Sequence, residues 1–269
     1  MKNLAKKLMV APGTKIKLAD VDPADTHGIE KAGAGEHLAK NIERLSVLQY
    51  QLYAEARRAL LVVLQGIDAA GKDGTIRHVM TGMNPQGVKV TPFKEPEGAE
   101  KRHDYLWRVH AAVPEWGMIG IFNRSHYEDV LIVRVHNLVP KSEWAPRYEQ
   151  INEFERMLSE SGTRIVKLML YIDKDEQARR FRLRLQDSTK NWKFSASDVK
   201  EREYWDQYIE AYEAVLRKCS TEYAPWYVVP ANRKWFRNLA VSQILIETLE
   251  SMNLKFPKPK ADLSTIHFE

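Results

Sequence analysis

Residues 60–75 read LLVVLQGIDAAGKDGT, an apolar run that leads into a loop bounded by glycines. The run over residues 59–64 is apolar at every position, which is typical of a parallel strand buried on both faces, and residues 75–80 are compatible with a helix. Gly66 and Gly71-Lys72 have the G-x-x-x-x-G-K spacing, in which backbone N–H groups surround phosphate oxygens and the lysine contacts the terminal phosphate. The stretch therefore predicts a strand, a phosphate-binding loop and a helix, where an ordinary tight turn is the simpler alternative.

Two acidic residues depart from the usual phosphate loop. Asp73 takes the place of the Ser or Thr that follows the lysine and holds Mg²⁺, and Asp68 lies inside the loop. A carboxylate repels phosphate unless a cation lies between them, so Asp73 either caps the helix or faces a metal, and Asp68 indicates a metal beside the phosphate. The phosphate-binding residues predicted for this stretch are Gly66, Ala69, Ala70, Gly71, Lys72, Asp73, Gly74 and Thr75.

The composition is that of an ordinary enzyme that stays in the cytoplasm. The 269 residues are enough for one α/β domain with short appendages, and the net charge of +5 permits a polyanionic partner without demanding one. Cys219 is the only cysteine, which excludes an internal disulfide and a cysteine-based metal cluster. The basic start has too short an apolar stretch for a secretory signal, and no run is long enough to span a bilayer, so we expect no membrane partner.

Apolar patterns along the chain alternate between strand and helix. Strands are predicted over residues 59–64, 88–93, 117–122, 164–172 and 225–230, and helices over 36–58, 75–80, 100–112, 144–158, from 178 onward, 204–215 and 235–252. This alternation predicts a parallel five-stranded sheet with helices on both faces. We expect an N-terminal arm over 1–35, a phosphotransferase domain over 36–253 and a tail over 254–269.

Arginines dominate the helix that follows the fourth strand. Arg180 and Arg184 lie four residues apart on one polar side, and we expect no acidic partner for them at the same spacing. Such a pair repels unless an anion lies across it, so we interpret residues 178–200 as a lid over the transferring group. A solvated helix face is the alternative. Lys190 and Lys193 lie in the polar connector that follows this helix.

A second polar segment follows the third strand, at the edge where open α/β sheets bind ligands. Arg124 supplies a fork-shaped, always charged donor suited to a transferring phosphoryl group. Asn123 stands where many phosphate-loop enzymes have a Mg²⁺-binding Asp, so the acid must come from Asp68, Asp73, Glu128 or Asp129. After the second strand, Phe93 and Lys94 are candidates for contact with the acceptor base, although Phe93 is equally compatible with core packing.

With these residues identified, the chain resembles the polyphosphate kinase 2 family from about residue 36 to residue 253. The motifs that carry the resemblance are Gly66-x-Asp68-x-x-Gly71-Lys72-Asp73-Gly74-Thr75, Phe122-Asn123-Arg124-Ser125-His126-Tyr127-Glu128-Asp129-Val130, Arg180-x-x-x-Arg184-Leu185 with Lys190-x-Trp192-Lys193-Phe194, and Ala224-Pro225-Trp226-Tyr227-Val228-Val229-Pro230-Ala231-Asn232. Asn123 with Glu128-Asp129 is similar to the branch that phosphorylates both mono- and diphosphates.

The resemblance implies a fold similar to thymidylate kinase, with a helical lid. It implies transfer of phosphate from inorganic polyphosphate to AMP and ADP, giving ADP and ATP. The metal would be Mg²⁺ or alternatively Mn²⁺, and GMP and GDP would be further substrates. It also implies assembly into homodimers or homotetramers. The implied roles are catalysis by Asp68, Lys72 and Arg124, metal binding by Asp68, Asp73 and Glu128, polyphosphate binding by the loop with Arg124, Arg180, Arg184, Lys190 and Lys193, and nucleotide binding by Phe93, Lys94, Asn123 and Glu128.

Two other functions fit the same sequence features. A nucleoside monophosphate kinase that uses ATP would have the same architecture. A basic nucleic-acid-binding protein whose loop senses nucleotide belongs to a different class. Aromatic and basic residues are not interleaved on one continuous stretch, and no nucleic-acid-binding motif is present, so we expect no nucleic-acid partner.

Overall fold

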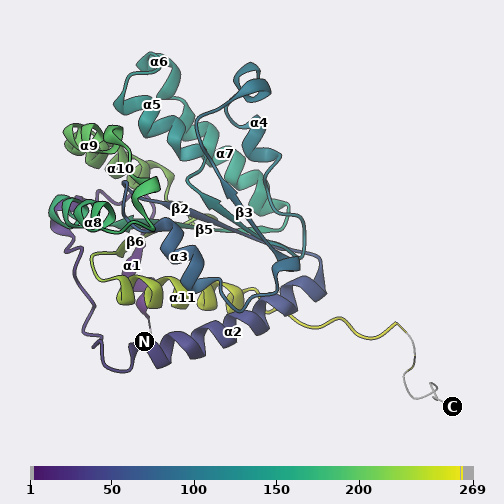
Figure 1. Ribbon diagram of the computed structural model, residues 1–269. Helices are drawn as coiled ribbons and strands as arrows, with labels where there is room; N and C mark the ends of the chain where they lie inside the picture. Colours follow the sequence, from purple (N-terminus) through teal and green to yellow (C-terminus); the bar gives the residue numbers. More distant parts are fainter. Residues whose placement is uncertain (1–2, 261, 263–269) are drawn as a thin grey trace.

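The computed structural model describes residues 3–260 and 262, which form a sheet between two layers of helices (Figure 1). The six-stranded sheet has the order β1-β6-β5-β2-β4-β3. All neighbouring strands are parallel except β1, which pairs antiparallel with β6. The strands are β1 (Met9–Val10), β2 (Ala59–Gln65), β3 (Val88–Pro92), β4 (Ile119–Asn123), β5 (Thr163–Tyr171) and β6 (Trp226–Pro230).

The apolar run over residues 59–64 forms the strand β2, at the centre of the fold. Every residue of β2 is buried, and the strand lies between β5 and β4. Leu60, Val62 and Leu64 belong to the core on one face of the sheet, whereas Leu61 and Val63 belong to the core on the other face. A strand with two covered faces has no solvent side on which polar residues could alternate.

Helices cover both faces of the sheet. In Figure 1, α2 and α11 cover one face, and α7 and α10 lie on the other. The longer helices are α2 (Ala34–Glu55), α3 (Lys72–Val79), α7 (Arg147–Glu160), α8 (Lys174–Gln186), α10 (Trp205–Cys219) and α11 (Lys234–Ser251). The short ones are α1 (Leu4–Leu8), α4 (Trp107–His110), α5 (Ile132–Val135), α6 (Lys141–Trp144) and α9 (Ala196–Glu201), with 3₁₀ turns η1 (Leu18–Asp20), η2 (Pro85–Gly87), η3 (Gly98–Arg102), η4 (His126–Val130), η5 (Asn191–Lys193) and η6 (Arg202–Tyr204).

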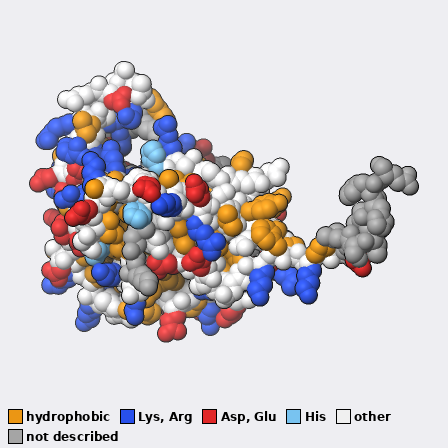
Figure 2. Space-filling model, turned by 90° about the horizontal axis from the view of Figure 1, so that it is seen from below, with side chains coloured by type: hydrophobic (Ala, Val, Ile, Leu, Met, Phe, Trp, Pro, Cys, Tyr) orange, Lys and Arg blue, Asp and Glu red, His pale blue; other side chains and the backbone are white. Residues whose placement is uncertain are grey.

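The outer surface on the side of α2 has mixed charge. Figure 2 shows Lys and Arg side chains interspersed with Asp and Glu there, and basic side chains gather toward the side on which α8 lies in Figure 1. Within the described residues, no helix combines the length and the apolar character needed to cross a bilayer.

The prediction of five strands is corrected to six, because the N-terminal segment contributes β1 to the edge of the sheet. A strand of two residues is too short to show an alternating pattern, so the sequence did not reveal it. The same segment passes the end of β6, where Asn232 N donates to Pro23 O over 3.0 Å and Arg233 Nε donates to Ala24 O over 3.0 Å.

Two predicted helices are broken in the structure. The helix predicted over 100–112 is replaced by η3 and α4, because the Asp104 carboxylate accepts from Leu106 N over 2.9 Å and competes with helical hydrogen bonding. The helix predicted over 144–158 is divided into α6 and α7, because Pro146 has no N–H to donate and belongs at a helix start.

Candidate active site

The loop between β2 and α3 requires glycine at two positions. Gly66 has a φ of 155°, and a Cβ there would lie 2.7 Å from Leu170 O. Gly71 has a φ of 107°, and a Cβ there would lie 1.9 Å from a guanidinium nitrogen of Arg237. These two turns direct the chain into α3, whose first residue is Lys72, so the start of this helix lines the cleft described below.

Lys72 and Arg124 approach the loop from two different elements. Lys72 Nζ donates to Gly66 O over 2.6 Å, and Arg124 Nη2 donates to Asp68 Oδ1 over 2.8 Å. Burial and the Arg124 charge lower the pKa of Lys72. Burial would lower the pKa of Arg124, but Glu128 and Asp68 raise it above its ordinary value. Two cations and two carboxylates therefore meet at the carboxyl ends of β2 and β4.

The carboxylates differ in their partners. Asp73 Oδ1 accepts from Asn123 Nδ2 over 2.9 Å, and Asp68 is paired with Arg124. Burial raises the pKa of Glu128 even though Arg124 and Lys72 act against it. Among residues 3–260 and 262, no three His, Cys, Asp or Glu side chains are close enough to hold a metal on their own. One or two carboxylates beside substrate phosphates are nevertheless the usual donors for Mg²⁺, and this site fits that arrangement.

Arg180 is buried and joins the phosphate loop to the segment before α11. Its Nη1 donates to Ala69 O over 2.9 Å and to Ala70 O over 2.8 Å, and its Nη2 donates to Ala231 O and Asn232 O. Its Nε donates to Glu176 over 2.6 Å. Arg180 thus lines the cleft while its donors bind protein acceptors.

The expectation that the arginines of α8 lack acidic partners is wrong. Glu176 pairs with Arg180 at 2.6 Å, and Arg184 lies 3.5 Å from Asp198 of α9. Lys190 pairs with Asp187. Glu176 lies four residues before Arg180 and therefore on the same face of the helix. The prediction compared only the spacing between the arginines and overlooked this acidic residue. The side chain of Lys193 lies outside the described part of the structure.

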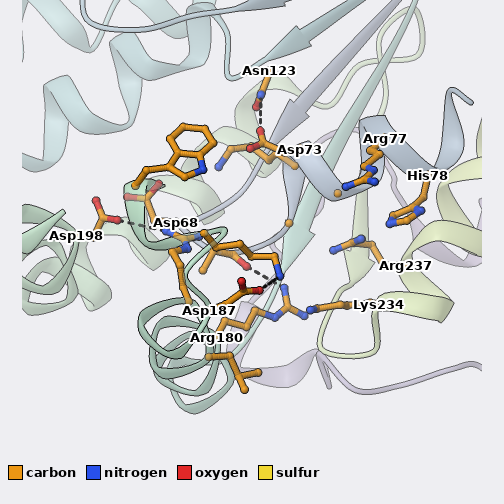
Figure 3. A pocket seen from close by; sticks show the side chains of 18 of the residues that line it. Asp68, Asp73, Arg77, His78, Asn123, Arg180, Asp187, Asp198, Lys234 and Arg237 are labelled. Atoms are coloured by element: carbon orange, nitrogen blue, oxygen red, sulfur yellow. Dashed lines mark hydrogen bonds and ion pairs between the residues drawn. The ribbon is translucent and has the colours of Figure 1, made fainter. Parts of the chain in front are cut away.

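One cleft of about 1460 Å³, shown in Figure 3, is lined by Asp68, Lys72, Asp73, Arg124 and Arg180. Two sides of this cleft are distinguished by the helices that supply them. The α8 side comprises Arg180, Arg184, Asp187 and Lys190. The α11 side comprises Arg77 and His78 of α3 with Lys234 and Arg237 of α11, and these four lie together in Figure 3, across the cleft from Asp68.

Sequence reasoning missed the α11 side. Lys234 and Arg237 lie more than 160 positions after Lys72 in the chain, so local spacing does not connect them with the loop. Only the sheet topology could have indicated these residues. Strand β6 is parallel to β5 and β2, so the segment that follows β6 begins at the same edge of the sheet as the loop after β2. Burial and the nearby Arg180 charge lower the pKa of Arg237 to about 10, and burial with the Arg180 and Arg237 charges lowers the pKa of Lys234.

Two predicted site residues are largely occupied by contacts within the protein. The Thr75 side chain is buried, and its hydroxyl donates to Gly71 O over 3.1 Å, so this hydroxyl closes the first turn of α3. Phe93 lines the cleft, but its ring is buried edge-on against Phe122, with 4.8 Å between centroids. The exposed Lys94 next to it also lines the cleft.

A smaller cavity of about 240 Å³ shares Asp68 and Arg124 with the main cleft. Glu128 lines this smaller cavity, together with Tyr208 and Tyr212 of α10. Glu128 is therefore placed beside the Asp68–Arg124 pair, on the side of α10.

Known proteins match this chain over nearly its full length. The family described as Polyphosphate kinase 2 (PPK2) matches residues 28–257. The chain is 53% identical over 266 residues to an AMP/ADP-polyphosphate phosphotransferase of Meiothermus ruber, covering 98% of this chain and 100% of the relative. It is 47% identical over 274 residues to an ADP-polyphosphate phosphotransferase of Rhodopseudomonas palustris, covering 96% and 94%. The crystal structure of polyphosphate kinase 2 from Arthrobacter aurescens TC1 matches with a TM-score of 0.94 and 48% identity, covering 98% and 94%.

Proposed function

The chain belongs to the polyphosphate kinase 2 family, and from that premise we propose that it transfers a phosphoryl group from inorganic polyphosphate to AMP and ADP, giving ADP and ATP. The observation that carries this proposal is the meeting of Lys72 and Arg124 at a phosphate loop inside a large cleft with basic sides. The relatives named for phosphate transfer from polyphosphate to AMP or ADP support the choice of substrates.

The chemistry requires positioning and positive charge more than proton transfer. The acceptor oxygen belongs to a phosphate that is already ionised, so no strong general base is needed. Lys72 and Arg124 are placed to neutralise charge on the transferring group, and the backbone N–H groups at the start of α3 add to this stabilisation. A divalent ion, which we propose to be Mg²⁺ with Mn²⁺ as an alternative, would be held by Asp68 with Asp73 or Glu128 and would supply positive charge that neutralises the substrate phosphates.

The two substrates need separate places in the cleft. We propose that the donor chain extends along the α11 side, where cations lie without recorded carboxylate partners among the described residues. Lys94, Asn123 and Glu128 then remain for the acceptor nucleotide near the end of β4. In this arrangement both polyanions meet in line at Lys72 and Arg124.

One assay tests the proposal. The protein is mixed with Mg²⁺, AMP and polyphosphate, and the products are separated by chromatography. We expect ADP first and ATP later, and we expect ADP alone as acceptor to give ATP. Replacing polyphosphate by ATP tests the alternative of an ordinary nucleoside monophosphate kinase. Transfer from ATP to AMP with none from polyphosphate would contradict the proposal. Further reactions in the same assay omit the metal or offer GMP or GDP as the acceptor.

We also propose that the chain self-associates into a dimer or tetramer. Exposed apolar side chains on α2, among them Val47 and Tyr50 at 48% and 54% exposure, are candidates for the contact. Sedimentation velocity measures the assembly directly, and a monomer at micromolar concentration would contradict it.

A further inference from the structure

A cluster of charged and polar side chains is buried beneath the site and is not used by the chemistry proposed above. We call it the buried network, and it consists of His126, Tyr127, Glu155 and Lys167, none of which lines either cavity. All four are at most 1% exposed.

The contacts of the buried network connect several elements. Lys167 Nζ, from β5, donates to Glu155 Oε2 of α7 over 2.5 Å, to Tyr127 Oη over 2.9 Å and to Cys219 O at the end of α10 over 2.6 Å. Glu155 Oε1 accepts from Tyr127 Oη over 2.9 Å and lies 3.1 Å from His126 Nε2. Burial alone would raise the pKa of Glu155, but Lys167 and His126 lower it below its ordinary value, so the carboxylate stays ionised.

The stability of the fold does not by itself explain a buried ion pair at this place. Removing two charges from water costs about as much as their attraction returns, and well-packed apolar residues often replace such a pair without loss of stability. A specific geometric role is the alternative explanation, and the position of the network in the chain indicates which geometry is concerned.

The network begins two residues after Arg124. Arg124 has a φ of 64°, a left-handed conformation that costs free energy for a residue with a side chain and persists only where the surroundings hold it. On one side it is held by β4 and by its own N–H, which donates to Leu64 O over 3.0 Å. On the other side Ser125 is buried, and its hydroxyl accepts from Gln65 Nε2 and from Tyr127 N. The next two residues, His126 and Tyr127, both contact Glu155.

We propose that Glu155 and Lys167 are positioning residues that act through His126 and Tyr127 to hold Arg124 in its left-handed conformation. Its guanidinium then stays beside Asp68 and the phosphate loop, where it meets the transferring group. This inference rests on the proposed role of Arg124 in phosphoryl transfer.

A double-mutant cycle with Arg124 tests the inference. Tyr127→Phe keeps the ring that packs on Trp226 but removes the hydroxyl, and the double variant Glu155→Leu/Lys167→Met replaces the ion pair by apolar residues. We expect kcat to fall about fivefold for the first and at least about tenfold for the second, with KM for polyphosphate changed less than about twofold. In an Arg124→Ala background, neither change should alter kcat by more than about twofold, because the residue being positioned is gone.

A matched control separates positioning from general loss of stability. Asn41→Ala removes a buried hydrogen bond of 2.9 Å to Ser242 between α2 and α11, which cover the face of the sheet opposite to Tyr127. It should lower the melting temperature without changing kcat at 25 °C. If the network variants lose kcat equally in the wild-type and in the Arg124→Ala background, the inference is overturned. If the double variant Glu155→Leu/Lys167→Met does not fold, Tyr127→Phe alone decides.

The readout also separates this inference from the proposed function. A wild-type protein that transfers nothing from polyphosphate refutes the function. The conformation of Arg124 is then compared in crystal structures of the wild type and of Tyr127→Phe, which requires no turnover. An Arg124 that leaves its left-handed conformation or its contact with Asp68 in the variant would support the inference, and an unchanged Arg124 would overturn it.

Discussion

The two sides of the cleft carry positive charge in opposite ways. On the α8 side, each basic residue described above has a carboxylate partner: Glu176 for Arg180, Asp198 for Arg184 and Asp187 for Lys190. On the α11 side, no ion pair is recorded for Arg77, His78, Lys234 or Arg237 among the described residues, and burial and neighbouring cations lower the pKa of Lys234 and Arg237.

This difference shows that a count of basic residues does not locate an anion site. The charge of a paired arginine is already largely neutralised by a protein carboxylate. Binding of an anion between cations that lack such a partner reduces the repulsion between them. The cations of the α8 side hold helices and the loop between β2 and α3 together. On the α11 side Arg237 is itself buried and donates to Ala70 O and Asn238 Oδ1, so we expect the exposed Lys234 to make the main contact with the polyanion.

The largest effect is expected at the carboxyl ends of β2 and β4, between the two sides and the neighbouring carboxylates. Lys72→Ala and Arg124→Ala should each lower kcat by at least about a hundredfold, because each removes charge directed at the transition state. Steady-state kinetics with AMP and polyphosphate measures the loss, and circular dichroism verifies the fold. Near-normal turnover in a folded variant would remove that residue from the catalytic group.

A matched pair of lysines tests the comparison directly. Lys234 on the α11 side and Lys190 on the α8 side are both exposed and line the same cleft, but only Lys190 has a recorded carboxylate partner among the described residues. Lys234→Ala should raise KM for polyphosphate about tenfold, the effect of losing one hydrogen bond to a charged group, and Lys190→Ala by less than about threefold. The reverse order would place the donor chain on the α8 side.

Salt should weaken the reaction in a way that depends on the same side. We expect KM for polyphosphate to rise about fivefold between about 0.05 M and about 0.5 M NaCl, because screening reduces attraction between exposed charges. The rise should be smaller in Lys234→Ala. A KM that is flat across ionic strength would count against an electrostatic track on either side.

The smallest effect is expected from pH. Cationic groups with lowered pKa lose their charge at a lower pH than usual, and for Arg237 this value is about 10. Because the protonated forms bind the anion, KM for polyphosphate should rise about threefold as the pH increases from about 8 to about 10. A control with ADP as the varied substrate should show a weaker trend. A KM for polyphosphate that falls over this range would show that the α11 side does not bind the donor.

The central strand and the loop were predictable because their signals are local. The unbroken apolar run predicts the complete burial of β2. Gly66 and Gly71 predict turns, because glycine tolerates positive φ. The edge strand β1 left no such signal, because two residues show no period.

The candidate site was predictable only in part, for a related reason. Lys72 and Asp68 lie within one loop, and the position of Arg124 follows from the rule that parallel strands bring their carboxyl ends to one edge. The partner of Arg184 was missed because Asp198 comes from a different helix. The partner of Arg180 was predictable, since Glu176 lies four residues before it on the same helix face.

The sequence by itself determined that a buried parallel strand ends in a glycine-bounded loop carrying Lys72, and that a cationic residue follows the neighbouring strand. Only the tertiary structure decided which of the described cations have a carboxylate partner. The physical reason is that charge neutralisation depends on distances of a few ångströms between side chains. Residues far apart in the chain, such as Lys234 and Lys72, reach the same cleft only when the sheet aligns the ends of its strands.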